Sequence, residues 1–426
     1  MHRKSVLLAL LLLVALLLGG CSLLPEDPDN FSYSVNSDNS AVINGYVGSR
    51  REIVIPAIIH GHKVVGVDEG AFDGNEELTS IVLPQYLTSI GDNAFSGCTK
   101  LARIEFPASL RTIGSKSFYD CESLTEVVLP EGLESIGGNG FWFCTNLTSI
   151  QLPDSLREIG GAAFANCQSL ESIRLPARLT EVGWKLFSSC GRLKQVTFPK
   201  GLKIIQEEAF SGCSALRELT LPQGLEKIGC GAFSNCIYLE KINIPASVKE
   251  MYVEAYTTRM DNPMNPFQSC YSLKTIELDP ANRIYFQRDG ALIRRSDMTL
   301  IDYQPTDTAQ GYVIPEGVRT IGGGAIRTLK GAQPQLTIPS SVTSIGKYAI
   351  HINNLTELVI PTSVKKLDDM AIWLCDELRS VTIPASVTTL TSEAIRSCTA
   401  LESIIVDRGS RAARVFADDP RLVIRN

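Results

Sequence analysis

The chain has 426 residues, of which 44% are apolar and 20% charged, and its formal net charge is −6. This composition is typical of a globular protein with a large core and excludes a disordered chain. A mildly acidic chain without a basic stripe is poorly suited to the phosphate backbone, so we expect no nucleic-acid partner.

The first twenty residues have the pattern of an export signal. Arg3 and Lys4 supply a positive end, and an unbroken apolar run follows that is too short for a comfortable membrane span. The run ends in Leu-Gly-Gly-Cys at Cys21, which resembles the bacterial lipoprotein signal. We therefore predict a signal peptide over 1–20, lipid attachment at Cys21, a tether over 21–30 and an extracytoplasmic protein anchored at the cell surface. The alternative is an ordinary signal peptide or membrane anchor with an unrelated cysteine.

The rest of the chain is dominated by a repeat with a period of 23 residues. Proline, phenylalanine and cysteine each recur at this step, as in Phe95, Phe118 and Phe141. A fixed period of this length is the signature of a solenoid, in which stacked units bury a continuous core that one unit cannot bury alone.

One unit shows how each coil is built. Leu101, Ile104 and Phe106 have the spacing of a short strand whose alternate side chains point inward. Pro107 ends the strand because it has no N–H to donate. The remaining positions are expected to bury Leu110 and Ile113, to turn at Gly114 and to close the coil over Ser117–Cys121 as a short helical or 3₁₀ turn.

The spacing divides the chain after residue 30. In the second array isoleucine replaces phenylalanine in the column, at Ile326, Ile350, Ile372 and Ile395. The expected parts are an N-terminal cap (31–70), a first repeat array (71–278) with an inserted loop (251–266), a β-hairpin insertion (279–312), a second array (313–406), and a C-terminal cap (407–426) with a short helix and a strand.

The repeat L-x-x-I-x-L-P-x-x-L-x-x-I-G-x-x-A-F-x-x-C resembles the BspA-type leucine-rich repeats of bacterial surface proteins over residues 41–426. The hairpin sequence YFQRDGALI and the ending GSRAARVFA are also similar to features of that family. The resemblance implies a mainly β, right-handed solenoid of about 13 coils of about 23 residues, with parallel strands on the concave face. It implies no shared active site. Ser109 or Gly132 stands where the commoner leucine-rich repeat has a stacking asparagine.

Ten of the 12 cysteines occupy one column of the repeat, and Cys21 and Cys230 do not. Exported chains with many cysteines often contain disulfides. Neighbouring coils, however, hold Cβ atoms about 4.8 Å apart, whereas a disulfide needs about 3.8 Å. A column also forms a line rather than a tetrahedral metal site. We therefore expect a ladder of buried thiols, rather than disulfides or a metal site.

Catalytic motifs are missing from the sequence. Histidine is scarce, and no G-x-S-x-G elbow is present. His60 and His62 form a weak metal-ligand pair without a third ligand, so an exposed turn of the cap is the better interpretation. We expect a protein that is not an enzyme and needs no cofactor or metal.

The remaining hypotheses concern binding. The outward strand positions form two mixed, polar columns, one from Ser80 to Lys241 and one from Val82 to Asn243. Four aromatic residues stand at variable positions near the phenylalanine column: Tyr119, Trp142, Phe143 and Trp184. The pattern is consistent either with partial burial of these side chains or with an exposed cluster. Long loops on a rigid scaffold often carry function, and the inserted loop contains Met251, Tyr252, Tyr256, Met260 and Met264.

These features predict a monomeric, non-catalytic protein that adheres to a host protein or glycan through its repeat surface. The alternative is a structural or assembly lipoprotein that binds components of the bacterium's own envelope. Both alternatives include the membrane as a partner through the lipid anchor.

Overall fold

The computed structural model describes residues 24–251, 265–305, 309, 311–328 and 335–426. Its contacts divide the chain into two compact units, Met1–Cys167 (unit 1) and Gln168–Asn426 (unit 2). The fold is a mainly β solenoid of about fifteen turns of about 23 residues, as the repeat predicts. The sequence-based figure of about 13 is low, because strands of both caps continue the sheets of the arrays.

The cap of unit 1 contains the 3₁₀ helix η1 (Pro28–Asn30) and five strands: β1 (Phe31–Val35), β2 (Ala41–Tyr46), β3 (Glu52–Val54), β4 (Ile58–Ile59) and β5 (His62–Val67). Strand β3 pairs in parallel with the first repeat strand, and Ile53 lies opposite Ile81. Glu26 is buried, and its carboxylate lies 3.2 Å from Arg50 Nε. The chain thus packs onto the cap within the segment expected as a tether.

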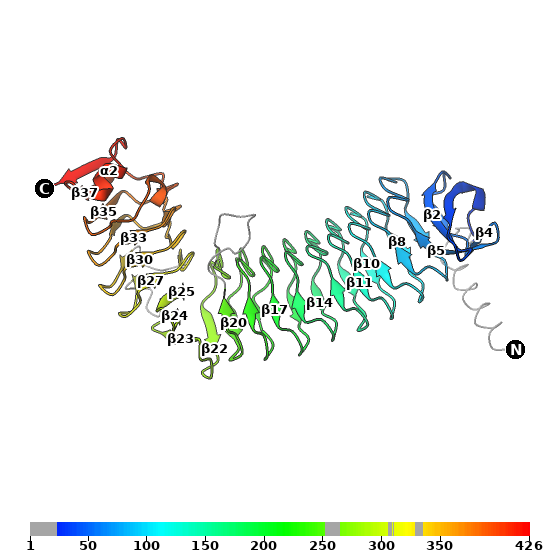
Figure 1. Ribbon diagram of the computed structural model, residues 1–426, viewed down its shortest axis with the longest axis horizontal. Helices are drawn as coiled ribbons and strands as arrows, with labels where there is room; N and C mark the ends of the chain where they lie inside the picture. The colour runs from blue at the N-terminus through cyan, green and yellow to red at the C-terminus, as the bar shows by residue number, and fades with distance from the viewer. Residues whose placement is uncertain (1–23, 252–264, 306–308, 310, 329–334) are drawn as a thin grey trace. The chain divides into compact units, whose positions relative to one another are not determined.

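Each coil of unit 1 contributes to two parallel ladders (Figure 1). The first contains the predicted strands: β6 (Ser80–Val82), β8 (Arg103–Glu105), β10 (Glu126–Val128) and β12 (Ser149–Gln151). The second was not predicted and contains β7 (Ser89–Ile90), β9 (Thr112–Ile113), β11 (Ser135–Ile136) and β13 (Glu158–Ile159). Leu110 and Ile113 are buried as predicted.

The segment that closes each coil of unit 1 is a run of hydrogen-bonded turns, in keeping with the turn predicted over Ser117–Cys121. Tyr119 N donates to Lys116 O at 3.0 Å, which is the i to i−3 bond of a 3₁₀ turn. Other amides bond to the next coil, as Phe118 N does to Gly140 O at 2.8 Å, so the turn does not extend into a helix.

The core of unit 1 is a stack of phenylalanine rings. Phe95, Phe118 and Phe141 are completely buried. Their ring centroids are 5.3 Å and 5.0 Å apart in successive pairs, with interplanar angles of 4° and 15°. The 23-residue period therefore appears in space as one continuous aromatic column.

Gly114 has a role different from the expected turn. It is not among the glycines with positive φ, so its backbone would allow other residues. A Cβ on Gly114 would instead lie 2.5–2.7 Å from atoms of Gly91 and Asp92 in the preceding coil. The position needs glycine because adjacent coils approach too closely for a side chain.

The first-array coils of unit 2 form two parallel ladders of their own. The first comprises β14 (Ser172–Arg174), β16 (Gln195–Thr197), β18 (Glu218–Leu219), β20 (Lys241–Ile244) and β22 (Thr275–Leu278). The second comprises β15 (Glu181–Val182), β17 (Ile204–Ile205), β19 (Lys227–Ile228) and β21 (Glu250–Met251). The insertion that follows the first array is an antiparallel meander of β23 (Tyr285–Arg288), β24 (Ala291–Arg294) and β25 (Thr299–Tyr303).

The second array has strands on three sides. The first side contains β26 (Tyr312–Val313), β29 (Leu336–Thr337), β32 (Glu357–Val359), β35 (Ser380–Ile383) and β37 (Ser403–Asp407). The second side contains β27 (Thr320–Ile321), β30 (Ser344–Ile345) and β33 (Lys366–Leu367). The third contains β28 (Ile326–Arg327), β31 (Ile350–His351), β34 (Ile372–Trp373) and β36 (Ile395–Arg396). This third ladder lies where isoleucine replaces phenylalanine, and β-branched residues favour extended backbone over turns.

The chain ends in a short helix and a final strand. A 3₁₀ helix, η3 (Ser392–Ala394), precedes the last repeat strand, and α2 (Arg411–Val415) follows it. Ser410 caps α2 by accepting a hydrogen bond from Ala413 N at 3.0 Å. Strand β38 (Leu422–Arg425) then pairs in parallel with β37.

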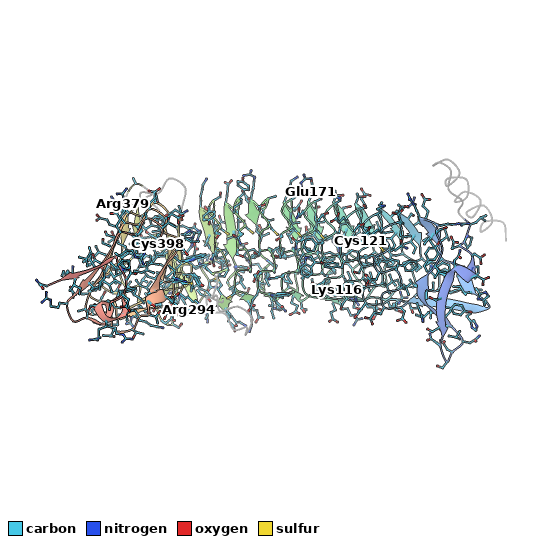
Figure 2. The ribbon with its side chains drawn as sticks, turned by 90° about the horizontal axis from the view of Figure 1, so that it is seen from above. Lys116, Cys121, Glu171, Arg294, Arg379 and Cys398 are labelled. Atoms are coloured by element: carbon cyan, nitrogen blue, oxygen red, sulfur yellow. The ribbon has the colours of Figure 1, made fainter. Side chains whose placement is uncertain are left out.

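The cysteines of the described residues are buried and are not joined by disulfide bonds. In the first-array column, thiols donate to the carbonyl of a phenylalanine in the preceding coil, as Cys121 Sγ does to Phe95 O at 3.2 Å and Cys213 Sγ does to Phe187 O at 3.1 Å. Figure 2 shows Cys121 in the interior, away from the exposed Lys116. This arrangement is the thiol ladder expected from the sequence.

We predict that the thiols of the first-array column are unreactive in the folded protein. Burial raises the pKa of Cys98 to about 12 and also raises the pKa of Cys121, so little thiolate exists near neutral pH. Iodoacetamide should label few cysteines of the native chain and all of them in urea. Adjacent-coil disulfides in a peptide map, or equal labelling rates in the two states, would contradict the ladder.

Candidate binding surfaces

The outward strand columns, and positions beside them, carry charges that are neutralised within the surface itself. Between the columns, Arg103 pairs with Glu105 at 2.6 Å in unit 1, and Lys241 pairs with Glu277 of the neighbouring coil at 2.7 Å in unit 2. In unit 1, hydrogen bonding from Lys100 and the charge of Arg51 lower the pKa of Glu77. The strand face therefore presents a mixed polar surface without a strong field of one sign.

Three of the predicted aromatic residues come together on the closing turns of unit 1. The Trp142 and Phe143 rings are stacked, with centroids 5.5 Å apart and planes 13° apart. Tyr119, from the preceding coil, meets Trp142 edge-on at 5.8 Å and 84°. All three side chains are half-buried. We call this group the aromatic triad.

Phe143 occupies a backbone conformation that is unfavourable for a bulky residue. Its φ is 64°, in the left-handed region. The equivalent position of the other first-array coils holds Gly, Asp, Asn or Ser, all with positive φ: Gly74, Gly97, Asp120, Asn166, Ser189, Gly212, Asn235 and Ser269. Phe143 is thus the one large apolar side chain in this column of described residues, and it carries backbone strain there.

Trp142 adds a second local cost. Its indole nitrogen is buried and has no hydrogen-bond partner among the described residues. A buried donor that loses water without gaining an acceptor destabilises the fold. Two neighbouring residues therefore each carry a local cost, and such departures concentrate at functional sites.

Replacing Phe143 by asparagine should leave stability nearly unchanged. Relief of left-handed strain is worth about 1–2 kcal/mol and offsets the loss of an aromatic contact worth about 0.5–1.5 kcal/mol. The matched change Phe106→Asn, at a half-buried ring that packs edge-on against Phe118 at 5.8 Å, should cost about 2 kcal/mol or more. Urea unfolding of both variants measures these changes in stability. Equal losses of stability in the two variants would show that packing, and not backbone strain, dominates at Phe143.

The other predicted aromatic residues are not part of the triad. Trp184 belongs to unit 2, where it is 41% exposed and Lys185 Nζ lies 4.8 Å from its ring centroid. Tyr252, Tyr256 and Met260 lie outside the described residues. Met251 is described and is buried in β21, so it belongs to the core rather than to a binding loop.

Unit 2 contains a related group that the sequence analysis missed. The segment Trp373-Leu374-Cys375 repeats the pattern of Trp142-Phe143-Cys144, and Leu374 also has a positive φ of 50°. Tyr348 meets Trp373 edge-on at 5.0 Å and 79°. The detectable signal was the triplet W-[F/L]-C, which occurs in both arrays.

A buried ion pair in unit 2 was also missed. Asp302 and Arg327 are 1% and 2% exposed and pair directly. Arg327 Nε donates to Cys270 O at 3.2 Å, and Gln304 Nε2 donates to the Asp302 carboxylate at 3.0 Å. The pair joins the last coil of the first array, the meander and the second array. Its sequence signal was one acid within the buried strand β25.

The two histidines of the cap lie at a hairpin turn. His60 and Gly61 make the turn between β4 and β5 with φ values of 48° and 90°, as expected for a tight hairpin. His60 Nε2 lies 3.0 Å from the Asp29 carboxylate. Across the described parts of the chain, no group of three or more His, Cys, Asp or Glu residues is placed to hold a metal ion.

Cys21 and the apolar run before it lie outside the described residues, so lipid attachment remains a prediction. Among the residues that the structure does describe, no helix has the length and apolar character needed to cross a membrane.

Comparison with known families gives one match. A family model described as "BspA type Leucine rich repeat region (6 copies)" matches residues 65–183, 134–261 and 303–414. No curated protein matches the chain.

Several solved structures are similar. A leucine rich cell surface protein from Faecalibacterium prausnitzii is 27% identical with a TM-score of 0.58, over 92% of this chain and 97% of that one. A leucine-rich repeat protein from Bacteroides ovatus is 20% identical with a TM-score of 0.52, over 95% and 100%. A leucine-rich repeat protein from T. pallidum is 36% identical with a TM-score of 0.44, over 45% of this chain and 91% of that one.

Proposed function

Because this chain belongs to the BspA-type leucine-rich repeat family, we propose that it is a non-catalytic cell-surface protein that adheres to a host protein or glycan through its repeat surface. The observation that carries the proposal is the repeat itself: each coil buries its apolar side chains and presents variable side chains outward. The similarity over most of its length to a bacterial leucine rich cell surface protein supports the location.

The lipid anchor at Cys21 is part of the proposal. It rests on the positive end, the apolar run and the Leu-Gly-Gly-Cys ending of the export signal. Cells grown with a labelled fatty acid should yield a labelled protein, and the Cys21→Ser variant should be unlabelled. Labelling of that variant, or an unlabelled parent protein, would remove the anchor from the proposal.

Surface exposure separates adhesion from a structural role within the envelope. Trypsin added to intact cells should degrade the protein, because lysines and arginines of the repeats are exposed, as Arg103, Lys194 and Arg217 are. A cytoplasmic protein measured in the same sample should stay intact and so report on cell integrity. A chain that resists trypsin on intact cells but is cleaved after lysis would exclude adhesion and support the structural alternative.

A further inference from the structure

The aromatic triad is retained at a cost to the fold. Phe143 stands in a left-handed position that the equivalent described coils give to small or polar residues, and the buried Trp142 indole nitrogen lacks a partner. Neither residue is explained by stability, since the strain at Phe143 offsets what its ring contact contributes and the Trp142 indole nitrogen is left without a partner. A function other than folding is the simplest reason for both to occur side by side.

Polar groups flank the triad on both sides. Asp120 and Asn166 occupy the same column as Phe143 in the two adjacent coils, and both are half-buried. Asp120 N donates to Trp142 O at 2.8 Å, and Phe143 N donates to Ala165 O at 3.1 Å, which fixes both neighbours beside the rings. A carboxylate acceptor and a carboxamide therefore border the stacked pair.

The surroundings favour a sugar over a protein partner. A protein interface needs roughly 800 Å² per partner with an apolar centre. In unit 1 the large apolar side chains most exposed among the described residues lie in the cap, in the segment before it or on a strand, and none lies on the closing turns: Leu24, Val35, Val47, Ile58 and Val128. A small aromatic patch with polar neighbours instead matches a pyranose ring, which has one apolar C–H face and a rim of hydroxyls.

We propose that the aromatic triad binds a neutral hexose or N-acetylhexosamine unit of a glycan, with its C–H face against the Trp142–Phe143 pair and its hydroxyls hydrogen-bonded by Asp120 and Asn166. The inference rests on the proposed surface-binding function and names one ligand class and one site for it. The related Trp373 group lacks the flanking pair: its column neighbours are Ser397 and the completely buried Ile352. It should not bind these sugars.

The test uses the soluble chain from Ser22 to Asn426 and titrates it with chitotetraose, a β-1,3-glucan tetramer, mannotriose and lacto-N-tetraose. The sequence has 3 tryptophans, so Trp184→Phe with Trp373→Phe leaves Trp142 as the fluorescent reporter. At least one sugar should bind saturably below about 5 mM and alter Trp142 emission. Trp142→Ala should weaken that binding by at least about tenfold, whereas Trp373→Ala should not change it.

A second variant keeps the test valid if Trp142→Ala fails to fold. Asp120→Asn keeps the size of the side chain and a residue type that tolerates positive φ, so the fold should stay intact, and it should weaken binding of the same sugar. Absence of saturable binding to all four sugars, or binding that survives Trp142→Ala in a folded protein, overturns the inference. Binding of a host protein that Trp142→Ala leaves unchanged overturns only the sugar site and leaves the proposed surface-binding function standing.

Discussion

Asp302→Asn is expected to destabilise unit 2 by about 3–5 kcal/mol, because it leaves the Arg327 guanidinium buried without a counter-charge. Asn265 Nδ2 donates to Ile301 O at 2.6 Å and to Gly324 O at 3.3 Å, so the surrounding groups are already engaged. Little water can enter to solvate the lone cation. The measurement is the urea concentration at the midpoint of unfolding, monitored by a spectroscopic signal that arises in unit 2.

The control is an exposed pair of the same chemistry. Arg379 and Glu402 are 69% and 71% exposed and 3.9 Å apart, and Figure 2 shows Arg379 at the margin of the molecule. Glu402→Gln should cost less than about 1 kcal/mol. Replacing both buried partners, as Asp302→Leu with Arg327→Met, should recover most of the loss. If the Asp302→Asn variant were as stable as the parent protein, the ion pair would not be what holds the meander to the arrays.

Phe118→Ala is expected to cost about 3–5 kcal/mol in unit 1, because it opens a cavity in the middle of the ring column. Phe118 is completely buried, and it touches Phe95 and Phe141 on either side and Phe106 edge-on. Since coils are stabilised mainly by their neighbours, the loss should extend to adjacent coils. Hydrogen exchange of the amides in the coils on either side of Phe118 should therefore accelerate.

The matched variant Phe118→Leu keeps most of the volume and should cost about 1–2 kcal/mol. Arg103→Ala, at a 69% exposed side chain, should change stability by about 0.5 kcal/mol or less. If Phe118→Ala lowered the free energy of unfolding no more than Phe118→Leu, the ring column would be a consequence of the repeat and not its main source of stability.

The period of 23 residues was sufficient to predict the solenoid, the strand at Arg103–Glu105 and the buried thiols, because each follows from one residue type recurring at one position. The second ladder was missed because two-residue strands such as Thr112–Ile113 are too short to show alternation. The third ladder of the second array was missed because the change from phenylalanine to isoleucine looks conservative by hydrophobicity, although the two differ in backbone preference.

The binding surface was less predictable than the core. Tyr119, Trp142 and Phe143 were recognised as unusual for their positions. The left-handed backbone at Phe143, however, is not indicated by the local sequence of its own coil. It becomes visible only when its column is aligned with Asp120 and Asn166. The Asp302–Arg327 pair joins residues 25 apart in different types of element, so repeat spacing does not connect them.

Direct binding tests the central claim most simply. The soluble chain from Ser22 to Asn426 would be passed over immobilised host matrix proteins, host glycans and envelope fractions of the source bacterium. Adhesion predicts saturable binding to at least one host component, and a chain unfolded in urea and left unfolded should not bind. Binding to the bacterium's own envelope alone would contradict the account and assign the repeat surface to a structural role.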